Sequence, residues 1–586
     1  MTVHRYTVEL EPRRHQIKLT LELDAVPPGT LRLVVPTWVP GAYAFQRYGR
    51  DVLVLSAEDV GSGRPLSVTR EGWSGWRVSG GGSTVRLSAQ LNGWDPSTGE
   101  LTGLVDEEWG LLLATRYPFA PDLAGPREVE YRLPEGWPLH HPSGAVQLGP
   151  RRFRYESHPA LLDSPVVAGK VTRVEKRVRG TPLVALFLSV PVGYEEEGSS
   201  FLDQLGRLAE CCHDIFGGFP FADYTFIFDT SATSGWGIEH ASSTLVTLDP
   251  EVFVSAGRRA EALRVCGHEL FHAWNGTRLK PAPLGAPDLV AGSFPDGLWL
   301  TEGFTRYYEF LLGARSGWLR PQDVLSNLVN YHRHLVTRPA WTRVSPEDSS
   351  RATFLNHHRF AGAVNGSLDY YDQGMLVAFD LDVTLREEGD SLDAAMGDMF
   401  AVWARRGRGY TSEDALAFFA ARSPSAGQLV SRGVREPGSV QTHRSLERLG
   451  FDLVHQEVGF LGVVLDDNTG PRVLDVADAS PAATAGLAAG DELLAVEGRP
   501  YRLGVLQFCL ARRGQLSLTV RHGERTRELV VGVGKRSELS RLVWAGSPAQ
   551  AEGLRRWLGD GGFRPQPGDD IPLGAYDNFH GIQRVL

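Results

Sequence analysis

The chain has 586 residues, of which 42% are hydrophobic and 22% charged, so it is a globular protein too long for one hydrophobic core. Its formal net charge of −10 argues against nucleic acid or an anionic membrane as a partner. The four cysteines are too few and too scattered to be a disulfide framework.

The amino-terminal stretch shows no targeting feature. The segment "MTVHRYTVELEP" lacks the charged start and continuous apolar core of a signal peptide. No stretch reaches the roughly 18 uninterrupted apolar residues of a transmembrane helix. We therefore expect a cytoplasmic protein that does not associate with membranes.

Residues 1–168 alternate apolar and polar side chains with period two. In "HQIKLTLELDAV" the residues Ile17, Leu19, Leu21 and Leu23 fall on one face, as in a half-buried strand. The segments "DVLVLSAEDV" and "STVRLSAQL" repeat the pattern between clusters of Gly, Pro and Ser. The pattern predicts an N-terminal antiparallel β domain resembling a sandwich.

Residues 169–452 mix strand and helix patterns, so we predict a multidomain α+β protein. Buried strands are predicted for "TPLVALFLSV" and "YTFIFDT". Helices are predicted for "FLDQLGRLAECCHDIFG", "GMLVAFDLDVTLRE" and "TSEDALAFFAARS".

A separate unit is predicted for residues 455–535, followed by a tail over 536–586. The segment "SPAATAGLAAGDELLAVEG" predicts a capped short helix, a turn and a strand. Upstream, "VGFLGVVL" supplies a Gly-rich loop that enters a strand. The tail contains one helical segment, "SPAQAEGLRRWLGD".

The stretch "VCGHELFHAWNG" carries the spacing H-E-x-x-H. An apolar stripe from Leu263 to Trp274 predicts a helix that stops at Gly276. Residues four apart lie on one helix face, so His268 and His272 can direct both imidazoles at one metal ion. Glu269 is placed to take a proton from water at that metal. The alternative is two ordinary histidines one helical turn apart.

A catalytic zinc site usually needs a third protein ligand, and Glu302 in "DGLWLTEGFTRYYEFLL" is the candidate. A carboxylate on a second helix packed against the first would complete the set. The alternative is a surface glutamate stabilised by the dipole of its helix. Glu309, seven residues further on, could support the ligands, but we expect it to be solvated.

Several motifs in order resemble the gluzincin aminopeptidases, the clan of aminopeptidase N and leukotriene A4 hydrolase. They are "HELFHAWNG", "WLTEGFTRYYE" and "LDYYDQG". The closer resemblance is to the glycyl aminopeptidase family, which pairs this catalytic domain with a PDZ domain. The segments "PTWVPGAYAFQRYGR" and "WGIEHASS" also resemble that family. The resemblance implies four domains: residues 1–168 β-sandwich-like, 169–452 thermolysin-like catalytic with a helical lobe, 455–535 PDZ, and the tail.

The resemblance also implies the zinc ligands and the base. They are His268, His272 and Glu302 as ligands of one catalytic zinc, and Glu269 as general base. "YDQG" is similar to the clan's Y-E-K-G, which implies that Tyr371 stabilises the oxyanion. Tyr370 is the alternative, because the tandem tyrosines can be aligned one residue apart.

"WGIEH" is similar to the clan's exopeptidase motif G-x-M-E-N, which implies that Glu239 binds the free α-amine of the substrate. The chain departs from that motif at His240, where the clan has Asn, and at the bulky Trp236. Trp236 could narrow the pocket for the first side chain, or it could pack into the core and leave the pocket roomy.

In the unit at 455–535, Leu461, Gly462 and Val463 fit an x-Φ-G-Φ loop. Backbone N–H groups of such a loop can receive the carboxylate of a peptide. The alternative is a domain that only packs against the catalytic part.

The predicted function is that of a zinc aminopeptidase that acts on peptides with a free N-terminal amine. The family resemblance implies a preference for Gly or Ala as first residue. The alternatives are a broad aminopeptidase, an endopeptidase or epoxide hydrolase on the same zinc site, and a catalytically idle protein that binds peptides through the PDZ domain.

Overall fold

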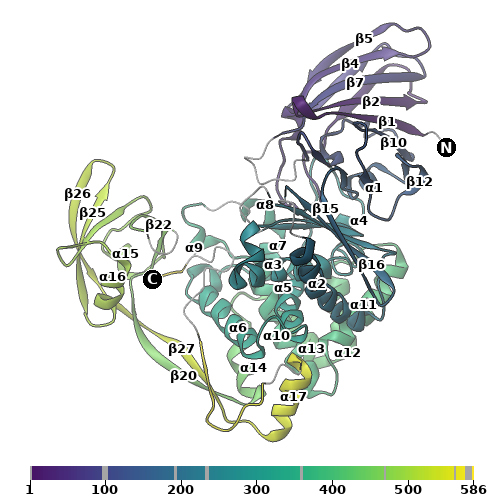
Figure 1. Ribbon diagram of the computed structural model, residues 1–586. Coiled ribbons are helices and arrows are strands. Elements are labelled where there is room, and N and C mark those ends of the chain that lie inside the picture. The colour runs from purple at the N-terminus through teal and green to yellow at the C-terminus, as the bar shows by residue number, and fades with distance from the viewer. Residues whose placement is uncertain are drawn as a thin grey trace. The chain divides into compact units, whose positions relative to one another are not determined.

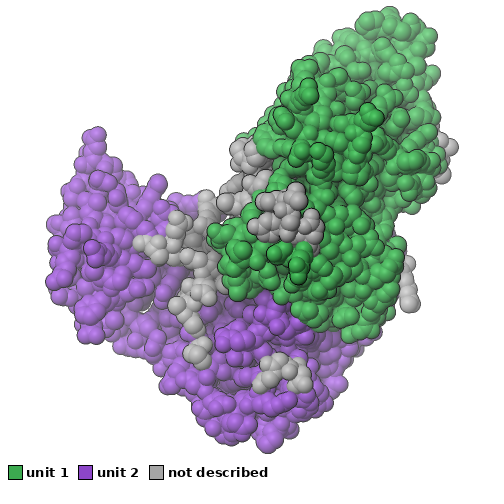
Figure 2. Space-filling model, viewed as in Figure 1, with its two compact units in different colours: residues 1–293 green, residues 294–586 purple. Residues whose placement is uncertain are grey.

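The computed structural model describes residues 3–94, 103–189, 195–230, 236–356, 360–466, 470–559, 563–573 and 584–586. By backbone contacts the chain forms two compact units, residues 1–293 and 294–586 (Figure 2). Within the described residues, no helix combines the length and the apolar character needed to cross a membrane.

The amino-terminal half of the first unit is built from two sheets. The first has ten strands in the order β12-β13-β10-β1-β2-β7-β4-β5-β6-β3, and the second has four in the order β11-β14-β9-β8. The bounds are β1 His4–Glu11, β2 Gln16–Asp24, β3 Thr30–Val34, β4 Val52–Asp59, β5 Pro65–Glu71, β6 Gly75–Ser79, β7 Thr84–Asn92, β8 Leu104–Val105, β9 Trp109–Leu112, β10 Arg127–Arg132, β11 Leu139–His140, β12 Val146–Gly149, β13 Arg152–Tyr155 and β14 Val166–Gly169. A short helix, α1 His158–Leu162, precedes β14.

The prediction of a purely antiparallel domain is wrong at one place, because β1 pairs with β10 in parallel. On its other edge β1 pairs with β2 through a short connection and is antiparallel to it. A parallel neighbour requires a long crossover, and more than a hundred residues separate β1 from β10. Alternation of side chains reports strands but carries no information about the direction of a distant partner.

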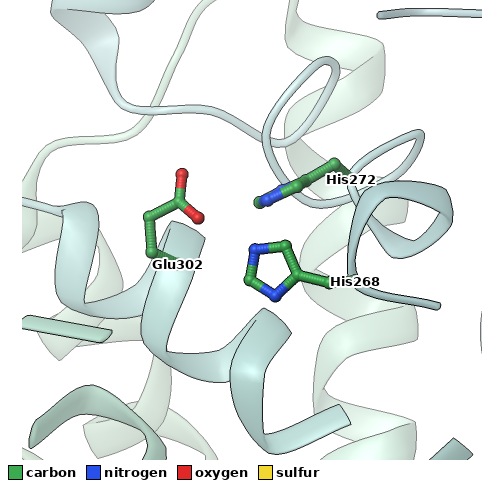
Figure 3. A group of neighbouring side chains, drawn as sticks. All are labelled: His268, His272 and Glu302. Carbon is green, nitrogen blue, oxygen red and sulfur yellow. The ribbon is translucent and has the colours of Figure 1, made fainter. Parts of the chain in front are cut away.

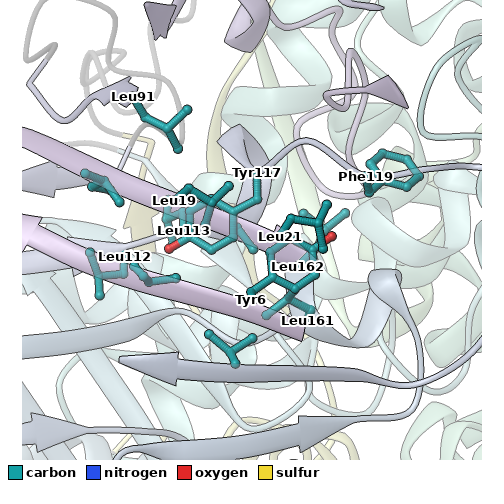
Figure 4. Close-up of a cluster of buried hydrophobic side chains, with 14 of the residues drawn as sticks. Tyr6, Leu19, Leu21, Leu91, Leu112, Leu113, Tyr117, Phe119, Leu161 and Leu162 are labelled. Carbon is teal, nitrogen blue, oxygen red and sulfur yellow. The ribbon is translucent and has the colours of Figure 1, made fainter. Parts of the chain in front are cut away.

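The period-two pattern does identify the core. Ile17, Leu19, Leu21 and Leu23 are each no more than 2% exposed. They belong to a cluster of buried side chains that also includes Tyr6, Leu91 and Tyr117 (Figure 4).

The rest of the first unit is a five-stranded sheet with helices. The order is β15-β16-β17-β19-β18, and both predicted buried strands, β16 and β17, are present. The bounds are β15 Thr172–Val178, β16 Thr181–Leu188, β17 Tyr224–Asp229, β18 Gly237–Glu239, β19 Ser243–Thr247, α2 Glu195–Phe216, α3 Ala256–Phe271 and α4 Ala282–Gly285. The edge strand β18 pairs with β19 in antiparallel fashion, so Glu239 lies on an open edge of the sheet.

The second unit begins with helices, among which α5 and α10 lie side by side (Figure 1). The bounds are α5 Leu298–Arg315, α6 Pro321–Val336, α7 Pro346–Arg351, α8 Thr353–Asn356, α9 Ala363–Gly366, α10 Tyr370–Glu387, α11 Leu392–Arg406, α12 Ser412–Arg422, α13 Pro424–Arg435 and α14 Thr442–Leu449. A Cβ atom added at Gly303 would lie 2.4 Å from Cα of Gly374. The two helices therefore touch backbone to backbone where they cross.

The carboxy-terminal part of the second unit is mostly β-structure. The bounds are β20 Phe451–Phe460, β21 Val463–Leu465, β22 Val473–Val476, α15 Pro481–Thr484, β23 Glu492–Val496, β24 Arg499–Pro500, α16 Leu503–Leu510, β25 Gln515–His522, β26 Arg525–Gly532, β27 Gly534–Trp544, α17 Pro548–Leu558 and β28 Asp570–Pro572. The predicted short helix and strand are α15 and β23, and the predicted tail helix is α17. The start of the predicted tail at residue 536 falls inside β27, which pairs along β20. The PDZ assignment and the four-domain division stay predictions.

Candidate metal centre

The H-E-x-x-H segment lies at the end of α3. Ser255 caps the start of this helix, since its side chain accepts a hydrogen bond from the backbone N–H of Arg258. The helix ends at Phe271, five residues before the predicted stop at Gly276. It ends there because Thr277 closes a turn, donating both its N–H and its hydroxyl to the carbonyl oxygen of His272 at 3.1 and 3.0 Å.

The turn after α3 fixes the orientation of His272. Its Nδ1 lies 2.6 Å from the carbonyl oxygen of Asn275. A carbonyl only accepts, so Nδ1 carries the proton and Nε2 presents its lone pair outward. Gly276 has a φ of 135°, and a Cβ atom there would lie 2.8 Å from Nδ1 of His272. Glycine is therefore required beside this imidazole.

Two histidines and a glutamate form a group with the composition of a zinc site. Ligand atoms of His268, His272 and Glu302 all lie within 4.8 Å of one another, and Figure 3 shows the carboxylate facing ring nitrogens of both histidines. All three side chains are buried. Two neutral imidazoles and one carboxylate are a known donor set for catalytic zinc, so these residues fit the metal. The alternative of two unrelated histidines does not explain the convergence.

Glu269 lies beside the same group. Its carboxylate, with ligand atoms of Glu239 and His272, forms a second set in which all atoms are within 4.8 Å. The side chain is only 6% exposed, and the backbone of β18 covers it: a Cβ atom at Gly237 would lie 2.5 Å from Cγ of Glu269. Burial raises the pKa of Tyr224 well above its usual value, and the charge of Glu269 adds to that rise.

Glu239 lines a cavity of about 230 Å³ whose walls are mainly apolar. The segment "PTWVPGAYAF" reaches it from the amino-terminal domain, because a Cβ atom at Gly41 would lie 2.8 Å from Oε2 of Glu239. His240, where the clan has Asn, is held by Asp163 at 3.1 Å from its Nδ1. The histidine that replaces the clan's asparagine thus has its own hydrogen-bond partner, Asp163.

Trp236 is partly buried and packs against the hydrophobic cluster of the first unit. Among the described residues that line the cavity around Glu239, Trp236 does not appear.

The two tyrosines at the start of α10 differ in environment. The hydroxyl of Tyr370 lies 2.8 Å from Oγ1 of Thr353, and burial, with the charge of Glu302 second, raises the pKa of Tyr370 well above its usual value. Tyr371 is more exposed, and the guanidinium of Arg306 lies 4.6 Å from its ring centroid. The rings stack on each other with centroids 4.9 Å apart.

Arg306 also binds the carboxylates at the start of α10. It forms an ion pair with Asp372 and lies 3.8 Å from Asp369. Burial, together with the charge of Asp369, raises the pKa of Asp372 to about 7 despite the opposing effect of Arg306. This arginine lies four residues after Glu302, on the same face of α5, so helical spacing could have identified it from the sequence.

The expectation that Glu309 is solvated is wrong, since it is 0% exposed. Nearly every residue of α5 is buried, so a carboxylate on any of its faces is inside the protein. Arg306 supplies a positive charge nearby: burial alone would lower its pKa, but the charge of Asp372 above all, with Glu309 adding to it, raises the pKa.

Leu461 and Gly462 of the predicted carboxylate loop immediately precede β21, and Val463 is its first residue. The backbone N–H groups of all three residues donate to one acceptor, the backbone oxygen of Leu586.

Comparison with known proteins identifies the relatives of the chain. Residues 261–377 match the M61 glycyl aminopeptidase domain, and residues 5–170 match the Peptidase M61 N-terminal domain. A solved structure of an aminopeptidase N family protein from Idiomarina loihiensis superposes with a TM-score of 0.82 and 21% identity, covering 95% of this chain and 100% of that chain. Glutamyl aminopeptidases from Bos taurus and Rattus norvegicus are 30% identical over 105 residues and 33% identical over 100 residues. These matches cover 17% of this chain and only 10% and 9% of those relatives.

The domain matches and the histidine–histidine–glutamate group together define a zinc metallopeptidase, which confirms the predicted enzyme class. The chain carries the amino-terminal and catalytic domains of the M61 glycyl aminopeptidase family, as the motif resemblance implied.

Besides Arg306, three contributors to the site were absent from the sequence interpretation: Gly41, Gly237 and Asp163. Each acts through a contact with a residue distant in sequence. No spacing rule reports such contacts, although Gly41 and Gly237 lie inside segments that carry the family resemblance.

Proposed function

We propose that the chain is a zinc-dependent aminopeptidase that removes the first residue from peptides with a free amine. The group of His268, His272 and Glu302 supports this most directly, because ligand atoms of two buried histidines and a glutamate lie within 4.8 Å of one another. These three side chains would hold one zinc ion. When bound, zinc supplies a Lewis acid that lowers the pKa of water and polarises a carbonyl.

The side chains around the metal ligands have distinct roles in this proposal. Glu269 takes a proton from the attacking water and delivers it to the leaving amine. The backbone of β18 covers Glu269, which shields its carboxylate from bulk water and fixes the direction in which the carboxylate points. Tyr371 donates its phenolic hydrogen to the oxyanion of the tetrahedral intermediate. Arg306 orients Tyr371 through the cation–π contact described above.

Glu239 would pair with the ammonium of the first residue. Its carboxylate belongs to the same set as Glu269 and His272, so an amine bound there lies one residue from the bond that Glu269 serves. The test compares hydrolysis of free and N-acetylated peptides. Acetylation should remove most of the activity. Equal rates on both would refute aminopeptidase action and favour an endopeptidase.

The finer proposal is a preference for Gly or Ala at the first position, which the family resemblance suggests. The sequence pattern made Trp236 the candidate wall of that pocket, although its indole packs against the hydrophobic cluster and is not among the described residues that line the cavity around Glu239. Two substrates that differ by one methylene in such a pocket differ by about 1–3 kcal/mol in transition-state binding. The preference should therefore decline gradually as the first side chain grows. If the indole narrows the pocket, Trp236→Gly should raise kcat/KM for Leu or Phe substrates relative to Ala. An unchanged ratio means that the indole only packs and that the enzyme is broad in specificity.

A catalytically idle peptide-binding protein is the second candidate, favoured only by the convergent N–H groups of the loop at 461–463. Zinc content and turnover of aminoacyl reporters separate the two. Stoichiometric zinc with turnover supports the peptidase, whereas a metal-free, inactive protein that binds peptides supports the alternative.

A further inference from the structure

The loop at 461–463 holds the last residue of the printed sequence. The backbone oxygen of Leu586 accepts hydrogen bonds from the N–H groups of Leu461, Gly462 and Val463 at 3.0, 2.5 and 3.2 Å. The N–H of Leu586 donates in return to the carbonyl oxygen of Val463 at 2.8 Å. Three convergent donors of this kind form a site for a peptide carboxyl group.

The loop is built so that all three donors point at one oxygen. Gly462 has a φ of 89°, in the left-handed region, and a Cβ atom there would lie 2.2 Å from Cβ of Ser480. The carbonyl groups of Leu461 and Gly462 accept bonds from Ala482 and Ala477 at 2.9 and 2.8 Å. The loop is thus anchored from behind and offers its N–H groups forward.

The residue before Leu586 adds to a sheet edge. Val585 forms an antiparallel bridge with Val464 of β21, whose other edge is taken by β22. Figure 1 marks the end of the chain within the carboxy-terminal β-structure. The carbonyl oxygen of Val585 also accepts a bond from Arg536 at 3.1 Å. This is the arrangement in which an extended peptide is bound by strand addition.

Both side chains fill apolar sites. Leu586 is 6% exposed and belongs to the core cluster that includes Leu461, Val463 and Leu506. Val585 is 2% exposed and packs against Val464, Ala477 and Val364 of α9. Leu586 therefore fills both the backbone site of the loop and an apolar side-chain pocket, while Val585 packs in a cluster that includes a residue of the helical part.

We propose that Arg584–Leu586 is an internal ligand of this groove, and that the groove takes the carboxyl end of peptides whose last residue is aliphatic. The internal ligand keeps the groove closed to such peptides until it is displaced. An occupant on the same chain has an effective concentration on the order of millimolar. It therefore lowers the apparent affinity of a free peptide whose Kd is about 10 µM by about 100-fold.

Occupancy of the groove by Val585 and Leu586 has a second consequence, because Val585 belongs to the same buried cluster as Val364 of α9. Asp475 of β22 accepts bonds from the N–H groups of Gly362 and Val364 at 3.0 and 2.9 Å, and Val364 is the residue of α9 that shares the buried cluster with Val585. The internal ligand is thereby part of the contact between the carboxy-terminal β-structure and the segment that precedes α10. A competing peptide has to replace that contact as well as the three bonds to the backbone oxygen of Leu586.

The experiment measures binding of fluorescein-labelled Gly-Ile-Gln-Arg-Val-Leu, the sequence of residues 581–586, to the full chain and to Leu586→Asp. The aspartate places a charge in the apolar pocket and releases the segment. The matched control is Val530→Asp, since Val530 lies on β26 and is 68% exposed. A chain ending at residue 583 is the second released form, and a peptide with an amidated end tests the need for the carboxylate.

The released chains should bind the free-acid peptide about 100-fold more tightly than the full chain and Val530→Asp do, and the amidated peptide should bind all of them weakly. In hydrogen–deuterium exchange, a peptide covering residues 461–463 should exchange faster in Leu586→Asp and slow again when the free-acid peptide is added. Affinities within about threefold for all chains would overturn the proposal. So would an absence of binding in both released forms, which would make the segment only a packing element. None of these readouts uses catalytic activity, so they stand independently of the proposed peptidase function.

Discussion

Gly237→Ala should impair catalysis without unfolding the protein. The added Cβ atom would lie 2.5 Å from Cγ, 2.7 Å from Cδ and 2.7 Å from Oε1 of Glu269. Carbon atoms pack at about 3.5 Å or more, so the carboxylate has to move by about 1 Å. A displacement of that size at a catalytic group can cost about 100-fold in kcat, equivalent to about 2.7 kcal/mol of barrier.

The assay follows kcat on an aminoacyl reporter, zinc content and the melting temperature. Zinc content should stay unchanged, because Glu269 is not among the proposed ligands. The melting temperature should change little, since the group displaced is the end of one side chain. Gly257→Ala is the matched control: it lies in the first turn of α3, the helix that carries Glu269, where an added Cβ atom meets only Oγ of Ser255 at 4.0 Å. That control should be active and slightly more stable, because alanine favours a helix over glycine.

A double-mutant cycle makes the test specific. If Gly237→Ala acts through Glu269, it should have little further effect in a Glu269→Gln background. The reasoning is refuted if Gly237→Ala alone keeps kcat within about threefold of the parent, or if its effect is fully additive with Glu269→Gln.

Three further predictions concern other parts of the chain. Glu302→Ala should lose both tight zinc binding and activity; a fully metallated, active variant would contradict its role as a ligand. Tyr371→Phe should keep zinc and lose about 10²–10³ in kcat, whereas a mild effect there with a severe one in Tyr370→Phe would shift the oxyanion donor by one residue. Burial, with the neighbouring His443 second, lowers the pKa of His332 to about 3, so the unfolded chain takes up this proton first as pH falls. The free energy of unfolding should therefore drop by on the order of 4 kcal/mol between about pH 6.5 and pH 3. His332→Gln should reduce the slope of the melting temperature against pH; an unchanged slope would show that this histidine titrates normally.

Local periodicity predicted the parts of the fold that depend on neighbours in sequence. The strand at Ile17–Leu23 follows from alternation alone, and its inward residues are buried as expected. The closeness of His268, in the last turn of α3, to His272, directly after that helix, follows from helical spacing in the same way. The exact end of α3 did not follow, because it depends on the hydroxyl of Thr277 and on the carbonyl of Asn275 beyond the helix.

For features that depend on contacts between residues distant in sequence, the sequence-based prediction was wrong or missing. The parallel partner of β1 is more than a hundred residues away, and alternation contains no information about it. Glu309 was expected in solvent because a helix usually has a polar face, but α5 is buried on nearly all sides. The role of Arg536 toward Val585 depends on the end of the chain returning to β21, which no local pattern reports.

The glycines in the site motifs show why these short sequences specify geometry as well as chemistry. Gly276 leaves room for the imidazole of His272, and Gly237 leaves room for the carboxylate of Glu269. Gly303, the residue after Glu302, meets Gly374 of the "YDQG" segment where α5 and α10 touch. In each case the space of a missing side chain is taken by a side chain proposed for the site or by the backbone next to one. A methyl group at Gly237 should therefore displace the site and lower kcat while the melting temperature stays nearly unchanged. Alanine at Gly276, where φ is 135°, or at Gly303, where two helices touch through their backbones, should lower the melting temperature as well.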